Sequence, residues 1–488
     1  MESSRPNLLL FMPDQLRSDV VGCFGSPVGG TPHIDALAAR GTRFTHAYSQ
    51  HSVCSPSRVS MMTGWYPHVA GHRTLTNLLK PWEPNLLGLL HDAGYHVAWA
   101  GERGDTFATG VADEVCDRRG FTVVPKELLH PSPYPHDSPW YRAHYHGRRE
   151  GDPDAVNNVL DFDEATVRTA IDWLGAGLPE PWVLFVALMF PHPPFVAEEP
   201  WFSMHDRASM PAPAPWRAQG KPEYMVGLRD RTGTGSLAAP DWQEIAATYH
   251  GMVSMVDDQL GRVLTAVDRA GHGERTMTWF FTDHGEYLGD HGLVEKWPSG
   301  LHDCLLRNPL VVAGPGVAED RRYDGMTEMV DLLPTMLEIA GIEPSHTHFG
   351  RSLVAALGGA DGPHRDYAFS EGGFLVEEEH LLERARPPYN IKADLQHDRP
   401  TTVGKATSVR DERYTYVHRI YEGPELYDRV ADPGETVNLA GNNEYDEVVQ
   451  RLRDALLDWS FATSDVIPWQ PDSRFESSFV SLFDRRQG

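Results

Sequence analysis

The sequence predicts an α/β protein in which helices alternate with the strands of a mostly parallel sheet. Three apolar runs, at residues 7–12, 181–188 and 276–281, have the length and composition of strands buried on both faces. Amphipathic stretches at 162–174 and 245–267 precede two of these strands and keep their apolar residues at helical spacing. Because helices and strands alternate along the chain, we expect a large mixed sheet sandwiched between helices.

Two shorter helices are predicted from local signals. Residues 31–41 begin with Thr31 as N-cap and Pro32 at the first helical position, and they close on a glycine. We expect this helix to pack on the sheet. Residues 329–340 also have helical character but contain Pro334, which either kinks the helix or divides it into two pieces.

Length, charge and cysteine content limit the class of protein. The chain has 488 residues, which exceeds the size at which a single core stops growing, so a large domain and a smaller one are expected. Its formal net charge of −26 argues against nucleic acid or an anionic membrane as a partner. The cysteines, Cys23, Cys54, Cys116 and Cys304, show neither metal-type pairing nor a disulfide framework, which favours a reducing compartment.

The N-terminal residues predict a cytoplasmic location. Residues 1–6 lead directly into the first strand, which leaves no room for a signal peptide. No apolar run approaches the roughly 20 residues that a membrane-spanning helix needs. We therefore expect a protein that stays in the cytoplasm.

The most informative segment is the pentapeptide Cys54-Ser55-Pro56-Ser57-Arg58. Pro56 is favoured in the first turn of a helix, which predicts a helix that starts just after Cys54 and runs to Thr63. Cys54 would lie at the helix N-terminus, where unpaired N–H groups favour an anion, and Arg58 can reach the same point. The pattern indicates an anion pocket around a nucleophile. The alternative is a buried cysteine that packs as a small hydrophobic residue.

Two strand ends supply candidate metal ligands. The apolar run from residue 7 ends in Asp14 and Gln15, and the run from residue 276 ends in Asp283 and His284. Ligands in open parallel sheets lie at the carboxyl ends of the strands, so these side chains are placed where a site is expected. A hard divalent cation held there would lower the pKa of a bound hydroxyl group. The alternative for an Asp after a strand is a turn or a helix cap.

The form Cys-x-Pro-x-Arg, together with residues 60–67, resembles the signature of the type I sulfatases in the alkaline phosphatase superfamily. In that family the cysteine is oxidised to formylglycine, whose hydrate carries two hydroxyl groups on one carbon. One oxygen attacks the sulfur, and deprotonation of the other expels sulfate and regenerates the aldehyde. The resemblance implies that a formylglycine-generating maturase converts Cys54 in the same way. It also implies a role for Arg58 at the sulfate.

The resemblance implies one divalent ion, held by Asp14, Gln15, Asp283, His284 and the formylglycine from Cys54. Oxygen-rich ligation favours Ca²⁺, and the histidine makes Mn²⁺ an alternative. Many sulfatases carry a second Asp where this chain has Gln15. The pair of Gln15 and His284 is more similar to that of phosphonate monoester hydrolases, which leaves the metal and the substrate class open.

Two further residues match family positions around the leaving group. His192, in the segment 191–195, resembles the family histidine that contacts the bridging ester oxygen and protonates the departing alcohol. Lys296, in the segment 292–296, resembles the lysine that touches the sulfate oxygens. The alternatives are a surface histidine that fits between prolines and a solvated lysine in a loop.

One segment departs from the family pattern. After residues 94–101 the family places a lysine, often with a histidine two residues later, whereas this chain has Glu102 and Arg103. A carboxylate beside an anionic substrate is costly at low dielectric unless something compensates it. Three interpretations are open: Arg103 replaces the missing cation, Glu102 binds a cationic part of the substrate or acts as a base, or the site is impaired. His72 and Arg73 either supply positive charge there or belong to a solvated loop.

The C-terminal part of the chain has a different pattern. Strand-like pieces at 367–370 and 414–418, with the segment 425–440, resemble the C-terminal region of sulfatases, which forms a small antiparallel sheet with a helix. We therefore expect a catalytic α/β domain at 1–366 and a C-terminal subdomain at 367–488.

Two long irregular stretches, 130–154 and 200–240, are rich in proline and aromatic residues. Insertions of this kind normally shape substrate pockets or oligomer contacts rather than cores. We expect them to determine specificity, or to contribute to a homo-oligomer.

The resemblance spans nearly the whole chain and implies hydrolysis of an organic sulfate ester. One alternative is a phosphonate monoester or phosphodiester hydrolase that uses the same site. Another is a non-catalytic binding protein with unmodified Cys54, an idea that Glu102 motivates. Since animal sulfatases that resemble this chain are made with secretory signals, we expect a bacterial protein.

Overall fold

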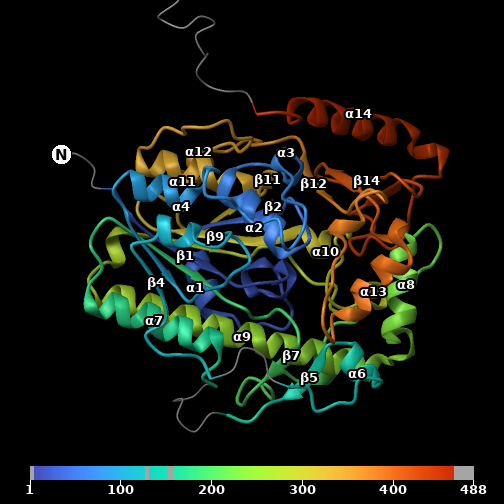
Figure 1. The fold of residues 1–488 in the computed structure, drawn as a ribbon, viewed down its shortest axis with the longest axis horizontal. Coiled ribbons are helices and arrows are strands. Elements are labelled where there is room, and N and C mark those ends of the chain that lie inside the picture. Colours follow the sequence, from blue (N-terminus) through green and yellow to red (C-terminus); the bar gives the residue numbers. More distant parts are fainter. Residues whose placement is uncertain (1–4, 127–130, 152–158, 467–488) are drawn as a thin grey trace, which may run out of the picture.

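The computed structural model describes residues 5–126, 131–151 and 159–466. Its centre is a mixed sheet with helices on both faces (Figure 1). In spatial order the strands are β10 (Arg321–Tyr323), β2 (Gly41–Tyr48), β9 (Arg307–Ala313), β8 (Thr276–Phe281), β1 (Asn7–Met12), β6 (Trp182–Ala187), β3 (His96–Ala100) and β4 (Arg118–Gly120), and β11 (Thr327–Glu328) pairs with β2.

Most neighbours in this sheet run parallel. β1 pairs in parallel with both β6 and β8, so Leu10 lies between Phe185 and Trp279. β9 is antiparallel to its neighbours β2 and β8. The predicted fold class is therefore confirmed, and the three strands predicted from apolar runs are the three central neighbours β6, β1 and β8.

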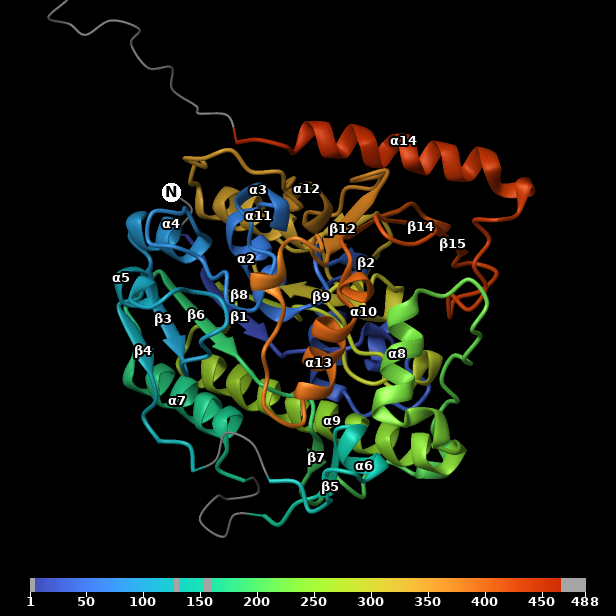
Figure 2. The same ribbon diagram turned by 45° about the vertical axis from the view of Figure 1, so that its right-hand side comes forward.

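Each face of the sheet is covered by its own set of helices. Alternate residues of β1 point to opposite faces: Leu9 and Phe11 belong to one buried cluster, and Leu8 and Leu10 belong to the other. The first cluster includes residues of α1 (Pro32–Ala39), α7 (Phe162–Ala176) and α9 (Ala239–Arg269). The second includes residues of α2 (Cys54–Thr63), α4 (Leu86–Asp92), α11 (Leu332–Ala340) and α12 (Val354–Leu357). Both views show α7 and α9 on the side opposite to α4 and α11 (Figures 1 and 2).

The stretch around Pro334 forms two pieces rather than one kinked helix. Met329–Asp331 is a short 3-10 segment, and α11 starts at Leu332. Pro334 then lies in the first turn of α11, where its missing N–H group leaves no intrahelical bond unmade.

A second, antiparallel sheet lies in the C-terminal part. It consists of β12 (Ala368–Gly372), β13 (Ala406–Arg410), β14 (Tyr414–Arg419) and β15 (Glu425–Asp428). Helix α13 (Asn390–Asp398) lies between β12 and β13 in the chain, and α14 (Asp446–Ala462) follows β15. The Ser370 hydroxyl donates to the carbonyl of Ser49, which joins β12 to the chain just after β2. The domain boundary after residue 366 stays a prediction.

The two irregular stretches contain short elements within the described residues. β5 (Tyr145–Arg148) pairs in parallel with β7 (Phe195–Ala197), which lies beyond β6 in the chain. The remaining helices are α3 (Pro67–Ala70), α5 (Val111–Val115), α6 (Pro139–Arg142), α8 (Glu223–Thr232) and α10 (Asp303–Leu306). Residues 130 and 152–154 of the first stretch lie outside the described part. Among the described helices, none combines the length and apolar character needed to span a bilayer.

Candidate active site

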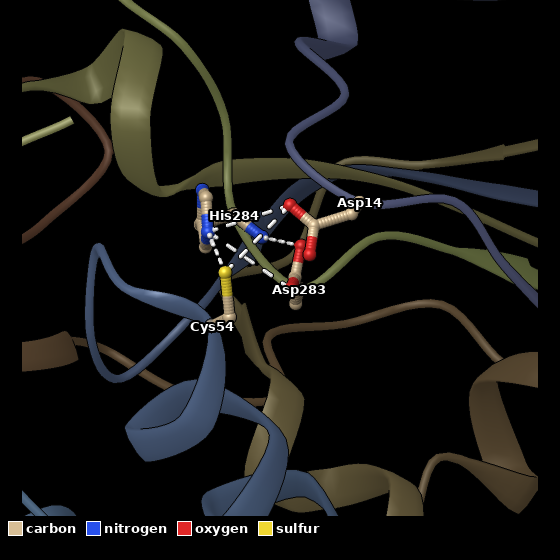
Figure 3. Close-up of side chains that lie close together, drawn as sticks. All are labelled: Asp14, Cys54, Asp283 and His284. Atoms are coloured by element: carbon tan, nitrogen blue, oxygen red, sulfur yellow. Dashed lines mark hydrogen bonds and ion pairs between the residues drawn. The ribbon is translucent and has the colours of Figure 1, made fainter. Parts of the chain in front are cut away.

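Two strand ends and one helix N-terminus meet at a single buried point. β1 and β8 are parallel neighbours, so the segments after their carboxyl ends bring Asp14 beside Asp283 and His284. Helix α2 begins at Cys54 and ends before Gly64, whose φ of 69° suits a glycine after a last helical turn. The candidate ligand atoms of these four side chains lie within 4.8 Å of one another, and all four are buried (Figure 3).

The histidine of this cluster presents a lone pair to its centre. His284 Nδ1 lies 2.9 Å from the carbonyl oxygen of Gly285, which only accepts, so Nδ1 carries the hydrogen. Its Nε2 therefore faces Cys54 Sγ at 3.3 Å and Asp14 Oδ1 at 3.9 Å (Figure 3). Burial lowers the pKa of His284, which keeps the imidazole neutral. A neutral imidazole fixed in one tautomer is the form that binds a metal ion.

The donor set of the cluster fits a divalent cation. Asp14 Oδ1 has a weak contact of 3.7 Å with Cys54 Sγ and faces the same centre as His284 Nε2. Asp283 supplies a second carboxylate, 3.9 Å from His284 Nε2. Two carboxylates and one imidazole suit calcium, manganese or another divalent ion.

Gln15 lies next to the cluster but turns its amide elsewhere. Its backbone N–H group donates to Asp283 Oδ1 at 3.0 Å. Its side-chain oxygen accepts from the Lys296 ammonium group, and its amide nitrogen donates to Glu286. Gln15 therefore connects Lys296 to the strand ends in this structure, and its role as a metal ligand stays a prediction.

Arg58 pairs with both carboxylates of the cluster. One helical turn after Cys54, its Nε donates to Asp283 Oδ2 at 2.8 Å and its Nη2 to Asp14 Oδ2 at 2.6 Å. Its Nη1 donates to Asp105 at 2.7 Å. Burial would raise the pKa of Asp14, but the charges of Arg103 and Arg58 outweigh it and hold that pKa below its usual range. The carboxylate of Asp14 is thus ionised at neutral pH.

The Cys54 thiol is protonated in this environment. Burial raises its pKa well above the usual range, and the charge of Asp14 raises it further. Lys296 and Arg103 oppose this effect without reversing it, so the site does not favour a thiolate nucleophile.

The segment after β3 places Arg103 inside the site and Glu102 outside it. Arg103 is 8% exposed and pairs with Asp14, while its Nε donates to Asp105 at 2.7 Å. The side chain of Glu102 is 51% exposed and pairs with Arg119 at 3.0 Å. This arrangement agrees with the interpretation that Arg103 replaces the lysine found in other family members. Its contact with a substrate stays a prediction.

His192 and Lys296 lie on either side of one carboxylate. Glu295 Oε1 is 3.2 Å from Lys296 Nζ and 3.8 Å from His192 Nε2. Burial lowers the pKa of His192 well below its usual range, Lys296 lowers it further, and Glu295 opposes both. The described contacts thus bring His192, Lys296 and, through Gln15, the strand ends into one network.

His72 and Arg73 have partners outside this network. His72 contacts the carbonyl of Asn77 at 2.7 Å and Glu83 at 3.1 Å. Arg73 pairs with Glu378, which follows β12. Among the described residues, no contact joins either side chain to Cys54, and their predicted role in substrate binding stays a prediction.

Sequence reasoning missed four residues around the site. Asp105 bridges Arg58 and Arg103, and alternating charge at positions 102, 103 and 105 was a signal that could have found it. Glu295 directly precedes Lys296 and could have been flagged by that position. Tyr389 and Lys392, at the start of α13, had no local signal, because only the tertiary fold brings them to His192 and Glu295.

The mixed sheet with its helices and the small antiparallel C-terminal sheet form the alkaline phosphatase-type fold, and a buried Asp/Cys/Asp/His cluster lies at its strand ends. The sulfatase family model matches residues 6–342, so the chain belongs to the sulfatase family. It is a sulfuric ester hydrolase.

Named relatives cover nearly all of the chain. It is 28% identical over 505 residues to the uncharacterized sulfatase YidJ of Escherichia coli (strain K12), across 96% of this chain and 92% of the relative. It is 28% identical to the multifunctional alkaline phosphatase superfamily protein PehA of Trinickia caryophylli, across 95% of this chain and 96% of that protein. The crystal structure of a phosphonate monoester hydrolase of Agrobacterium radiobacter superposes with a TM-score of 0.73 at 25% identity, covering 96% of this chain and all of that one.

Proposed function

We propose that this sulfatase hydrolyses its organic sulfate ester with a formylglycine made from Cys54, next to a divalent metal ion. The observation that carries the proposal is the buried cluster of Asp14, Cys54, Asp283 and His284, in which the cysteine lies among metal-ligand side chains. A protonated thiol is a poor nucleophile, and the environment of Cys54 favours the protonated form. Conversion to an aldehyde hydrate would supply two hydroxyl groups on one carbon, one to take the sulfuryl group and one to release it.

The residues around Cys54 are arranged to orient an anionic group. The positive charges of Arg103 and Lys296 both act on Cys54 and on His192. Arg58 donates to Asp14, Asp105 and Asp283, and Arg103 donates to Asp105 and the Leu188 carbonyl and pairs with Asp14, so both guanidinium groups hold the carboxylates. Lys296, whose ammonium group sits on a flexible stem, is the cation that we assign to the substrate oxygens, and Arg103 adds positive charge beside it.

His192 is the proposed proton donor to the leaving group. Its Nδ1 bonds to the carbonyl of Pro193, so the Nε2 side is turned towards Glu295 and the site. When the bond between sulfur and the bridging oxygen breaks, its electron pair stays on that oxygen, which takes the Nε2 proton and leaves as the alcohol. This proton comes from the imidazolium form, which burial and Lys296 disfavour in the free protein and which the negative charge of the bound ester favours. His192 becomes neutral when it gives the proton up.

Asp14, Asp283 and His284 would hold the metal ion, with the residue derived from Cys54. The ion would lower the pKa of a hydroxyl group and neutralise charge on the ester oxygens. We propose Ca²⁺, because the donors are mainly oxygen atoms, with Mn²⁺ as the alternative. Metal analysis of the purified protein tests this proposal, and added Ca²⁺ should raise the Tm of protein stripped with a chelator. Asp14→Asn and Asp283→Asn should abolish that rise.

A second candidate is hydrolysis of a phosphonate monoester or phosphodiester at the same site. It is supported by the residue pair Gln15 and His284 at the two strand ends and by the likeness to a phosphonate monoester hydrolase. Turnover of a matched pair, an aryl sulfate and an aryl phosphonate with the same leaving group, separates the two. We expect the higher kcat/KM on the sulfate, and a much higher value on the phosphonate would overturn that preference.

The structure does not support the main reason for considering a non-catalytic binding protein with unmodified Cys54. It was based on a carboxylate at position 102 beside the substrate, but Glu102 turns to the solvent and pairs with Arg119. Conversion by a maturase, a cytoplasmic location and a homo-oligomer stay predictions from the sequence.

A further inference from the structure

Glu295 lies between the two residues that act on opposite sides of the proposed scissile bond. Its carboxylate is almost completely buried and contacts Lys296 twice, at the ammonium group (3.2 Å) and at the backbone N–H (2.8 Å). The same carboxylate faces His192 Nε2 at 3.8 Å. Burial would raise the pKa of Glu295, but Lys296 and Lys392 hold that pKa well below its usual range, so the carboxylate is ionised.

Lys392 brings a second ammonium group to this carboxylate from the C-terminal part of the chain. It lies on α13, and its Nζ donates to Glu295 Oε2. Tyr389, just before α13, donates its hydroxyl to the carbonyl of Pro193 at 2.7 Å, and its ring centre is 6.1 Å from that of His192. The start of α13 therefore covers both His192 and Glu295.

The backbone of Glu295 is in an unfavourable conformation. Its φ is 68°, in the left-handed region that favours glycine. Strained residues of this kind persist where their surroundings hold them, and they cluster at active sites. Three charged or titratable partners, His192, Lys296 and Lys392, hold Glu295 in this conformation.

The charges around His192 show what the carboxylate does. Within the described part of the chain, the charges that act most strongly on the imidazole are those of Lys296, Glu295 and Arg103, and the Tyr389 ring lies beside it. Two of these groups are cations, which oppose a positive charge on the imidazole. Glu295 supplies the negative charge that favours it.

We propose that Glu295 is a positioning residue for proton transfer: it is the counter-ion of the His192 imidazolium, and Lys392 moderates its strength. This inference rests on the proposed role of His192 as proton donor. Glu295 neither gains nor loses a proton in the reaction. His192 gives its Nε2 proton to the leaving oxygen, becomes neutral, and is reprotonated from water.

The test is the pH dependence of kcat on an alkyl sulfate, whose poor leaving group needs the proton. Activity requires protonated His192, so it falls as the pH rises through the pKa of that residue. Glu295→Asn should move this fall to lower pH by about one unit, because an opposite charge at this distance favours the charged form by that amount. Glu295→Asp keeps the charge, and aspartate tolerates a positive φ better than glutamate. In this variant the fall in activity should occur at nearly the same pH as in the wild type.

Lys392→Gln should shift the pH at which activity falls in the opposite direction. Without the second ammonium group, the field of Glu295 at His192 is stronger, so the fall should move to higher pH by a few tenths of a unit. A merely structural role for the pair would lower activity in both variants without moving the profile in opposite directions. Thermal unfolding of each variant shows whether it is folded.

His192→Ala separates this inference from the proposed function. One outcome is that His192→Ala no longer shows the fall in activity at high pH, while Glu295→Asn and Lys392→Gln show it at the wild-type pH. In that case the inference about Glu295 is overturned and the proposed function stands. If the fall persists in His192→Ala, the inference and the role of His192 are overturned together. The chemistry at Cys54 is tested independently by the mass of its peptide.

Discussion

The two sides of the active site are built in different ways. On the nucleophile side, Asp14, Asp283 and His284 follow strand ends, and Cys54 starts a helix that packs on the same sheet. On the leaving-group side, His192 and Lys296 lie in loops, and Lys392 comes from the separate C-terminal part.

This difference indicates how the two sides are used. Strands buried on both faces hold the groups that must keep a fixed geometry, since a shift of about 1 Å can cost 100-fold in rate. Loops carry the groups that meet the alcohol, which differs from one substrate to another. Changes on the nucleophile side should therefore abolish turnover of every substrate, whereas changes on the leaving-group side should depend on the substrate.

The largest effect is expected from Cys54→Ala. Removal of the nucleophile should lower kcat/KM by about 10⁴-fold or more on every ester tested. The fold should persist, because the change removes one small side chain at a helix end, and thermal unfolding checks this. Cys23→Ala, which alters a cysteine outside the cluster, is the matched control and should keep full activity. Substantial turnover by Cys54→Ala would show that the nucleophile lies elsewhere.

His192→Ala should have a smaller effect that varies with the substrate. General acid catalysis contributes about 10²- to 10⁴-fold, and it matters most when the leaving alcohol is poor. We expect a loss in this range on alkyl sulfates and little loss on 4-nitrophenyl sulfate. Equal losses on both esters would contradict the assignment of His192 as proton donor.

The adjacent pair Glu102 and Arg103 gives a matched comparison within one segment. Arg103→Ala should lower stability by about 3 kcal/mol, because it removes a buried partner of Asp14, and it should also lower kcat/KM. Glu102→Gln changes an exposed side chain and should alter stability by no more than about 0.5 kcal/mol. Urea unfolding and kinetics of both variants measure this. A strong loss of kcat/KM in Glu102→Gln would show that the Glu102 carboxylate does act in the active site.

Tyr389→Phe should have the smallest effect. It removes one hydrogen bond to the Pro193 carbonyl, which also accepts from His192, and such a bond contributes about 1 kcal/mol. A few-fold loss of kcat on alkyl sulfates is expected. Tyr421→Phe removes a comparable hydrogen bond, to the N–H group of Val376, and should leave kcat unchanged. Equal behaviour of the two variants would argue that the start of α13 has no effect on proton transfer.

The same contrast explains how far the sequence could predict the site. Cys54, Arg58, Asp14, Asp283 and His284 occupy positions next to regular elements, and their elements formed as the apolar runs and the proline signal predict.

The leaving-group side depends on tertiary contacts between distant segments. Lys392 and Glu295 are 97 positions apart, and no local pattern links them. The orientations of Glu102 and Arg103 were equally open, because they are neighbours and only the backbone after β3 decides which side chain faces inwards. His72 and Arg73 looked close to the site in the sequence, but carboxylates of their own, Glu83 and Glu378, hold them.

Formylglycine at position 54 is tested most directly by the mass of the peptide that contains Cys54, measured on active protein from the native host. We expect a peptide in which the CH₂SH side chain has become an aldehyde, with activity in proportion to the converted fraction. An unmodified thiol in fully active protein would contradict this expectation.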